Sequence, residues 1–374
     1  MVLWRSIYER TLQQKNSHTD YGSLCIVGMG SGFATGQEIF QFFTSYGYKS
    51  FALIAIDLAG FVVVGGMLLT AGFRHKDEDG FSPARFFCGR YLGAFYEWFI
   101  PVSMFGGMVV LISGAGATLN EYYGLNHYIG SLLVAVAAFA AYVAGFQRFV
   151  RIVSVIGPVI ICFTLIVGIV TVIKDFDAAS AAGEAASELS RHQPVGIWWL
   201  AGILYLSYNL ADGSVFYTAL GGEAGNVREA LLGAIFGSTA LILAILLMNT
   251  AMLTEAARIC GLSIPSLYLA EKISAVLGLV FSVILICGIF STCSAMLWTV
   301  GQKFTRQGSR RSYIFAGCIA ALAFALGLLP FTDLIGTVYP YLGYAGLGYI
   351  ICVIYKGIKQ IYMRRTEITE RKED

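Results

Sequence analysis

Charged residues are scarce in this sequence. Asp, Glu, Lys and Arg make up 13% of its 374 residues, whereas hydrophobic residues make up 57%, and the mean hydropathy is +0.71. A water-soluble domain of this length could not bury so much apolar surface, so the composition indicates an integral membrane protein. The net charge of +2 provides no broad positive field for nucleic acid, and we expect no nucleic-acid partner.

The motifs of common enzyme and metal sites are also missing. The sequence contains no HExxH, P-loop, Ser-His-Asp or CxxC pattern, and its four histidines lie outside the apolar runs. We therefore expect no enzymatic activity and no cofactor. The eight cysteines lie almost entirely inside apolar runs without a secreted-type framework, so we interpret them as small hydrophobic residues.

Glycine, by contrast, is abundant. The chain has 43 glycines, where average usage of about 7% predicts about 26, and small residues let membrane helices approach closely or break. Charged or turn-rich segments separate apolar runs that are long enough to cross about 30 Å of hydrocarbon. We count ten such runs, at residues 22–45, 50–73, 92–119, 128–145, 149–173, 196–220, 229–254, 275–301, 312–329 and 331–357.

The distribution of Lys and Arg predicts the orientation of these spans. Ten spans place both termini on one side, and 20 of the 25 basic residues fall in the tails and loops of that side. Cytoplasmic loops are enriched in Lys and Arg. We therefore expect a multi-pass protein of the cytoplasmic membrane with both termini in the cytoplasm.

The spans form an apparent internal repeat. Spans starting near 50, 92, 128 and 149 are followed, about 181 residues later, by spans starting near 229, 275, 312 and 331. Each half holds five spans, so the second half is inverted, the usual construction of secondary transporters. The alternative is a coincidence of loop lengths. The expected segments are a cytoplasmic N-tail (1–21), a first repeat (22–173), an extracellular loop (174–195), a second repeat (196–357) and a cytoplasmic C-tail (358–374).

Two spans carry helix-breaking sequences at matching positions. Residues 27–36 of the first span read VGMGSGFATG, and residues 208–214 of the sixth read YNLADGS. Each interior Gly costs about 1 kcal/mol relative to Ala. We expect both helices to be broken there, and such paired breaks point to the binding site of a transporter. The alternative is that glycines four residues apart form a close-packing motif.

The broken ends predict the kind of ligand. Free N–H groups at residues 31–33 would bind a carboxylate, because the N-terminus of a helix carries positive partial charge. Carbonyls at residues 26–29 would attract a cation or an ammonium group. One broken helix could therefore bind both ends of a zwitterion.

A family resemblance agrees with this interpretation. The string from Gly30 to Ile39, GSGFATGQEI, resembles the YkvI-type amino-acid permeases of bacteria, and Met29 to Gly32 resemble the broken first helix of amino-acid/polyamine/organocation (APC) transporters. Those transporters share the LeuT fold of five plus five inverted spans. The resemblance covers essentially the whole chain and implies an all-α membrane protein of ten helices, with helices 1 and 6 broken.

The resemblance also implies site residues. Those expected to bind substrate are Gly28, Gly30, Ser31, Gly32, Phe33, Asn209, Ala211, Asp212, Gly213 and Ser214. Those expected to bind Na⁺ are Ile26, Met29, Ser291 and Thr292. Phe290 stands where one hydroxyl would be wanted, and the alternative for the eighth-span hydroxyls is bonding to carbonyls of their own helix.

Four acidic residues lie inside the apolar runs. An Asp at the centre of a membrane helix costs about 2.5 to 3.5 kcal/mol, so each acid needs an explanation. Asp57 and Glu97 come early in their spans, where a solvated or helix-end charge is expected. Glu38 either supports helix packing or takes up a proton, and Asp212 is the acid expected at the site. Glu38 and Asp212 are thus the candidates for proton coupling.

We therefore expect an ion-coupled secondary transporter, driven by Na⁺ or H⁺, of an amino acid or a similar small zwitterion. The alternative is a ligand-sensing receptor subunit on the same fold, similar to the germinant-receptor branch of the superfamily. Such a subunit would bind its ligand without transporting it. A channel is disfavoured because the sequence has no ring of acids and no carbonyl filter motif. The expected partners are the lipid bilayer and a small-molecule substrate, and the sequence does not indicate an oligomeric state.

Overall fold

The computed structural model describes residues 32–78, 80–175, 186–305 and 308–373, and every regular element in these ranges is helical. The nine long helices occupy the nine predicted apolar runs that follow the first. They are α5 (Lys49–Arg74), α6 (Pro83–Tyr123), α7 (His127–Ala144), α8 (Phe146–Asp175), α10 (Trp198–Gly222), α11 (Val227–Thr254), α14 (Ala275–Phe304), α15 (Arg310–Leu326) and α16 (Phe331–Glu373). The short elements are α3 (Gly32–Thr35), α4 (Gln37–Phe42), η1 (Thr44–Tyr46), α9 (Ala186–Leu189), η3 (Ser190–His192), α12 (Ala256–Ile259) and α13 (Pro265–Ile273).

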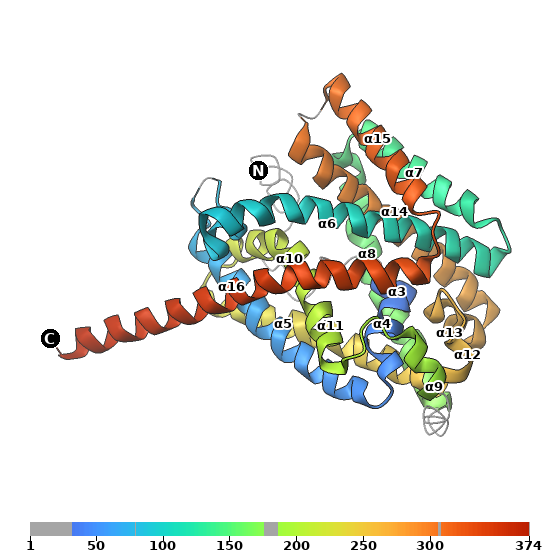
Figure 1. The fold of residues 1–374 in the computed structure, drawn as a ribbon, viewed down its shortest axis with the longest axis horizontal. Helices are drawn as coiled ribbons and strands as arrows, with labels where there is room; N and C mark the ends of the chain where they lie inside the picture. Colours follow the sequence, from blue (N-terminus) through green and yellow to red (C-terminus); the bar gives the residue numbers. More distant parts are fainter. Residues whose placement is uncertain (1–31, 79, 176–185, 306–307, 374) are drawn as a thin grey trace.

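The helices form two groups joined by long crossing helices. α5, α10 and α11 pack together on one side of the molecule, and α7, α14 and α15 pack on the other (Figure 1). α6 and α16 cross the face between these groups, and α16 continues beyond the bundle toward the C-terminus. α3 and α4 lie inside the bundle, where α4 contacts α10, α11, α13 and α16.

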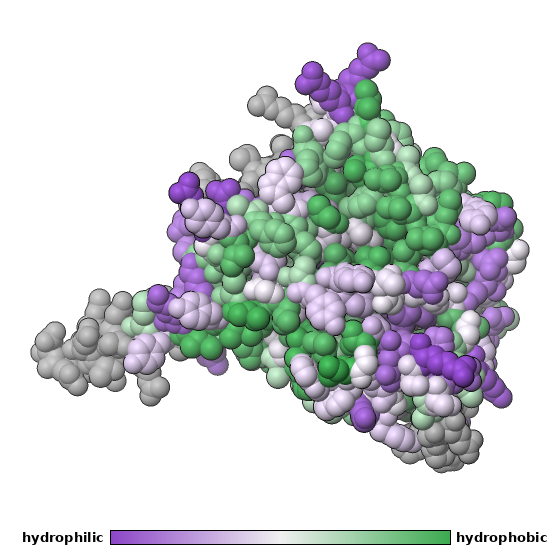
Figure 2. Space-filling view, in the orientation of Figure 1, coloured by the Kyte–Doolittle hydropathy of each residue, from purple (hydrophilic) through white to green (hydrophobic). Residues whose placement is uncertain are grey.

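The surface of the bundle suits a bilayer. Among the described residues, six helices are long and apolar enough to cross a membrane, namely α5, α6, α7, α11, α14 and residues 331–360 of α16. Figure 2 shows a broad hydrophobic surface over α7, α14 and α15, with hydrophilic residues gathered at its edges. Large apolar side chains on this surface and on α11, such as Leu133, Phe236 and Leu322, are exposed. Such side chains are stable only against lipid or another protein.

The order of elements repeats along the chain. α5, α6, α7 and α8 begin at Lys49, Pro83, His127 and Phe146, and α11, α13, α15 and α16 begin at Val227, Pro265, Arg310 and Phe331. Gly89 has φ 74° and breaks α6 shortly after its start, as Ser274 separates α13 from α14 in the second half. Helices thus begin at Pro83 and at Pro265 in the two halves, and the inverted repeat itself stays a prediction.

The sixth span is not broken. α10 is a single helix, so the predicted interruption at residues 208–214 is wrong. Two of the polar side chains there bond to their own helix without a break, because Asn209 donates to the carbonyl of Tyr205 at 2.9 Å and Ser214 donates to that of Ala211 at 2.7 Å. One interior glycine, Gly213, lowers the stability of the helix by about 1 kcal/mol relative to Ala, and a packed helix tolerates this loss.

The first span is interrupted within the described residues. α3 begins at Gly32, as expected for the outer half-helix, but it ends after one turn at Thr35. Gly36 then adopts the left-handed conformation with φ 78°, which favours glycine, and α4 begins at Gln37. Thr35 bridges the break, since its hydroxyl donates to the carbonyl of Gly32 at 2.7 Å and accepts from the N–H of Gln37 at 3.2 Å. The predicted break at residues 27–31 lies outside the described residues.

Candidate functional site

Glu38 is the acid nearest to the interruption of the first span. It lies in the first turn of α4 and is 6% exposed. Its carboxyl group fills the space beside Gly32, where an added β-carbon would overlap Oε1. Gly32 was predicted to leave room for a ligand, and in the structure the group that uses this room is Glu38.

Two tyrosines hold the carboxyl group of Glu38. Tyr208 of α10 donates its hydroxyl to Oε2 at 3.0 Å, and Tyr339 of α16 directs its hydroxyl at the same carboxyl group. The two rings stack with centroids 4.8 Å apart. The acid of the first span is therefore bound by side chains from the second half of the chain.

Asp212 lies on the same face of α10, one turn after Tyr208. Ser103 of α6 donates to its Oδ2 at 2.8 Å, whereas Oδ1 is buried and receives no hydrogen bond from the described residues. Tyr208, one turn before Asp212, is the residue that donates to Glu38. The two acids singled out for proton coupling thus lie in one part of the bundle.

Basic side chains pair with other acids. Arg85 pairs with Glu97 at 2.9 Å, and Ser82 also donates to Glu97 at 2.7 Å. Glu97 is therefore a partly exposed, ion-paired charge within α6 and not a helix-end charge. Among the described residues, no ion pair reaches Glu38 or Asp212, so the partners of these carboxyls are hydroxyls rather than cations.

Asp57 corrects an expectation. It is fully buried in α5, and neither of its oxygens receives a hydrogen bond from the described residues, so its interpretation as a solvated or helix-end charge is wrong. Gly202 allows α10 to cover it, since an added β-carbon there would lie 3.1 Å from Oδ1. Distance from the start of a span does not reveal which face a neighbouring helix covers.

The remaining predicted substrate residues divide into three sets. Phe33, Ala211 and Ser214 are buried, and Asn209 and Gly213 are half-buried on α10. Asn209 and Ser214 each donate a side-chain hydrogen bond to a carbonyl of α10 itself. The other predicted residues, Gly28, Gly30 and Ser31, lie outside the described residues, so the proposed carboxylate site stays a prediction.

The predicted sodium site is represented by its eighth-span residues alone. Thr292 donates to the carbonyl of Gly288 in its own helix at 3.1 Å, and Ser291 is buried in α14. α14 contacts α3, but the first-span ligands Ile26 and Met29 lie outside the described residues. The part of the chain that the structure describes holds no group of three or more His, Cys, Asp or Glu placed to bind a metal.

The helix α13 packs against the interrupted segment. Ser266 donates its hydroxyl to the carbonyl of Ala34 at 2.5 Å. A β-carbon at Gly36 would meet the side chain of Met252 at 2.5 Å and the backbone N of Ser266 at 3.0 Å. The break in the first span is therefore enclosed by residues of the second half.

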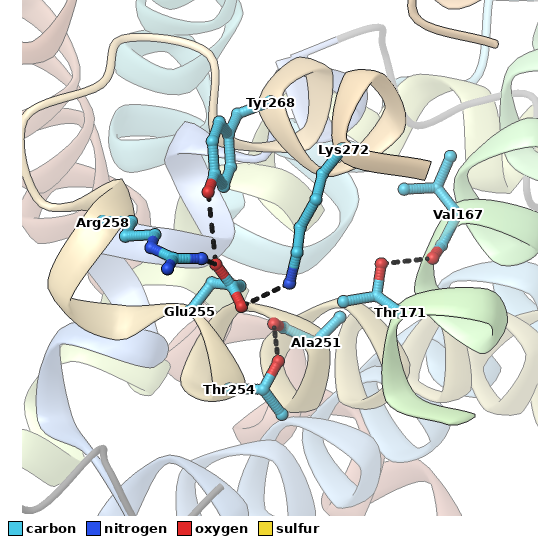
Figure 3. A network of polar contacts seen from close by, with 8 residues as sticks. All are labelled: Val167, Thr171, Ala251, Thr254, Glu255, Arg258, Tyr268 and Lys272. Carbon is cyan, nitrogen blue, oxygen red and sulfur yellow. Dashed lines mark hydrogen bonds and ion pairs between the residues drawn. The ribbon is translucent and has the colours of Figure 1, made fainter. Parts of the chain in front are cut away.

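A buried acid fixes the loop that carries α13. Glu255, which follows α11, accepts from Lys272 at 2.6 Å and from Arg258 and Tyr268, both at 3.2 Å (Figure 3). Sequence reasoning missed this network because its members lie in a loop outside the apolar runs. The network joins the end of α11 to both ends of the α12–α13 loop.

Comparisons with known proteins give a consistent but coarse assignment. No family model matches the chain. The chain is 25% identical over 331 residues to the protein described as uncharacterized membrane protein YkvI of Bacillus subtilis (strain 168), covering 88% of this chain and 92% of that one. It is 22% identical over 338 residues to uncharacterized protein YyaD of the same organism, covering 88% and 94%.

A similar solved structure is that of a manganese transporter variant from Eremococcus coleocola. The TM-score is 0.50 at 14% identity, over 87% of this chain and 75% of that one. At this identity the match speaks for the fold alone. The chain is an all-helical, multi-pass membrane protein that is similar to YkvI along most of its length and shares its fold with a solved transporter.

Proposed function

We propose that this chain is an ion-coupled secondary transporter of an amino acid or a similar small zwitterion in the cytoplasmic membrane. Its ten spans would form two inverted halves, at residues 22–173 and 196–357, with both tails in the cytoplasm and residues 174–195 outside. The similarity to the uncharacterized membrane protein YkvI and the fold shared with a solved transporter support this proposal.

The observation that carries the proposal is a pair of acids near an interrupted helix, of which Glu38 is buried and Asp212 is half-buried. Acids within membrane spans are expensive and mark substrate or ion pathways. Glu38 and Asp212 come from different halves, and Tyr208, which donates to Glu38, lies one turn before Asp212 on α10. The ammonium group of a zwitterion would lie between these carboxyls, and its carboxylate would meet the glycine-rich backbone at residues 30–32.

The coupling ion in this proposal is Na⁺ or H⁺. One monovalent cation that moves down about 100 mV releases about 2.3 kcal/mol, so a single ion drives roughly fifty-fold accumulation. Ser291 and Thr292 remain the proposed sodium ligands with Ile26 and Met29, and Glu38 and Asp212 remain the proposed proton carriers.

Thermal unfolding of the purified protein tests the proposal. A panel of amino acids would be screened with and without Na⁺, with MnCl₂ included because of the fold neighbour. Ligand at about 100 times its dissociation constant stabilises the native state by about 2.7 kcal/mol. We expect at least one amino acid to raise the midpoint and Mn²⁺ to leave it unchanged. A shift with Mn²⁺ alone would overturn the proposed substrate class.

Uptake into proteoliposomes separates a transporter from a sensor. We expect the amino acid that shifts the midpoint to accumulate inside vesicles under an ion gradient. Asp212→Asn would lower this uptake, whereas Glu97→Gln, the same change in a residue outside the site, would not. Binding without uptake would instead support the ligand-sensing alternative.

A further inference from the structure

Asp57 is a buried acid that the proposed substrate site does not use. It stands about 10 Å along the helix from the start of the predicted span at residue 50, at 1.5 Å per residue, and therefore lies at hydrocarbon depth. It is fully buried, and both carboxylate oxygens lack a hydrogen-bond partner among the described residues. A permanently ionised carboxylate in such surroundings is costly.

The surroundings of Asp57 restrict what it binds. A metal ion needs several oxygen or nitrogen ligands, and the described residues bring no group of three or more acids, histidines or cysteines together. α10 packs tightly here, since a β-carbon at Gly202 would lie 3.1 Å from Oδ1 of Asp57 and 3.0 Å from Leu53. A proton is the ligand that needs no further ligands and no added space.

Tyr205 connects Asp57 to the acid of the first span. It is almost fully buried and lies on α10 between Gly202, which covers Asp57, and Tyr208, which donates to Glu38. Its ring packs edge-on against Phe43 at 4.9 Å and against Tyr208 at 5.5 Å. The hydroxyl-bearing residue between the two acids is therefore held in place by aromatic neighbours.

Few titratable groups face Asp57. Tyr205 comes from α10, and Tyr217 of the same helix lies within electrostatic reach of Tyr205. The other elements that contact α5 are α6, α11, α16 and η1. Within the described ranges, they bring no charged side chain into an ion pair or hydrogen bond with Asp57.

We propose that Asp57 binds one proton and releases it again in each transport cycle, with Tyr205 connecting it to Glu38. Binding converts the carboxylate to a neutral carboxyl group by forming one O–H bond, and release breaks that bond. This inference rests on the proposed function and selects H⁺ as the coupling ion. It assigns the coupling proton to α5, apart from the substrate residues on α4 and α10.

Infrared spectroscopy tests proton binding without any substrate. Proteoliposomes would be titrated between about pH 5 and pH 9, and the carboxyl C=O band of the parent protein would be compared with that of Asp57→Asn. The amide resembles the protonated acid, so the variant keeps its packing. We expect Asp57→Asn to lose a titrating band of one carboxyl per molecule, whereas Glu97→Gln keeps it. An unchanged titration in Asp57→Asn would overturn the inference.

Proton movement during transport is the second test. Vesicles containing a pH dye would receive a mixture of the common L-amino acids under a pH gradient. We expect Asp57→Asn to lose pH-driven accumulation at least about tenfold, and the accompanying internal acidification, while it still exchanges internal for external amino acid. Tyr205→Phe would weaken acidification while keeping the titrating band, and it serves as the second variant if Asp57→Asn does not fold.

The two proposals fail in different ways. If the parent protein takes up no amino acid, the proposed function fails, whatever the infrared titration gives. If the parent protein accumulates amino acid and both Asp57→Asn and Tyr205→Phe acidify the vesicles like the parent, the proposed function stands and the role of Asp57 is wrong.

Discussion

The carboxyl group of Glu38 occupies the space into which a β-carbon at Gly32 would project. The missing side chain at position 32 is thus what lets Glu38 approach the start of α3 while Tyr208 holds its other oxygen. Gly32 was selected as a residue that binds substrate, but the group beside it in the structure is the carboxyl group of Glu38 in the same span.

Gly32→Ala should displace Glu38 and impair ligand binding. The new β-carbon overlaps Oε1, so the carboxyl group must move away from Tyr208. We expect at least tenfold weaker binding of the amino acid found in the panel, which corresponds to about 1.4 kcal/mol. Isothermal titration would measure it. Gly196→Ala, at an exposed site with open space around it, is the matched control, and equal affinities in both variants would contradict the prediction.

Tyr208→Phe should destabilise the protein and lower uptake. The change removes the donor to Oε2 of Glu38 while keeping the ring, and a buried group that loses its partner costs about 1 to 3 kcal/mol. Unfolding midpoints in detergent and uptake rates would measure the two effects. Tyr341→Phe makes the same change in a side chain that is 75% exposed. A midpoint no lower than that of this control would argue against the hydrogen bond.

Ser291→Ala/Thr292→Ala should leave pH-driven uptake intact if Asp57 carries the coupling ion. Thr292 donates within its own helix, and the double variant removes both hydroxyls of the candidate sodium site. Uptake would be measured at fixed pH with Na⁺ replaced by K⁺. Uptake that requires a Na⁺ gradient and collapses in the double variant would support the sodium site instead.

Glu255→Gln should loosen the loop that carries α13. Glu255 is the shared acceptor for Lys272, Arg258 and Tyr268, and a neutral amide cannot serve them equally well. We expect a loss of about 1 to 3 kcal/mol in the free energy of unfolding, together with faster proteolysis of the loop. Glu271→Gln neutralises an exposed acid of the same loop and should have no such effect.

Cysteine labelling would test the predicted orientation. In a cysteine-free background, Arg310→Cys should react only with reagent that reaches the cytoplasm, and Arg191→Cys should react from outside. Both positions are exposed, and the split of basic residues, 20 to five, places them on opposite sides. Labelling of both from the same side would contradict the topology.

Much of the fold could be predicted from the apolar runs and from the charged and turn-forming residues that separate them. The nine long helices match predicted apolar runs because charged and turn-forming residues end them, and Pro83 and Pro265 start short helices where the repeat expects them. The sixth span shows the limit of this reasoning. Polar residues and a glycine predicted a break, but side chains that bond back to their own helix remove the need for one.

The sequence predicted which acids belong to the candidate site, but it did not predict which residues form hydrogen bonds with them. Glu38 and Asp212 were selected because burying an acid in a membrane span is costly, and Tyr208, which donates to Glu38, lies one turn before Asp212 on α10. The partners Tyr208, Tyr339 and Ser103 were not predicted, because interfacial anchoring already accounts for tyrosines in membrane proteins. Asp57 was misjudged since burial depends on helix packing, which a single sequence does not contain.

The enclosed first span also sets an order for assembly. Ala34, Glu38 and Gln41 take their hydrogen-bond partners from positions 232, 170 and 291 residues further along the chain. The ribosome finishes the first span long before any of these partners exists, and the partner of Gln41 is in the last helix. The hydrogen bonds of this segment are therefore complete only after α16 is inserted, because Gln41 donates to the carbonyl of Thr332.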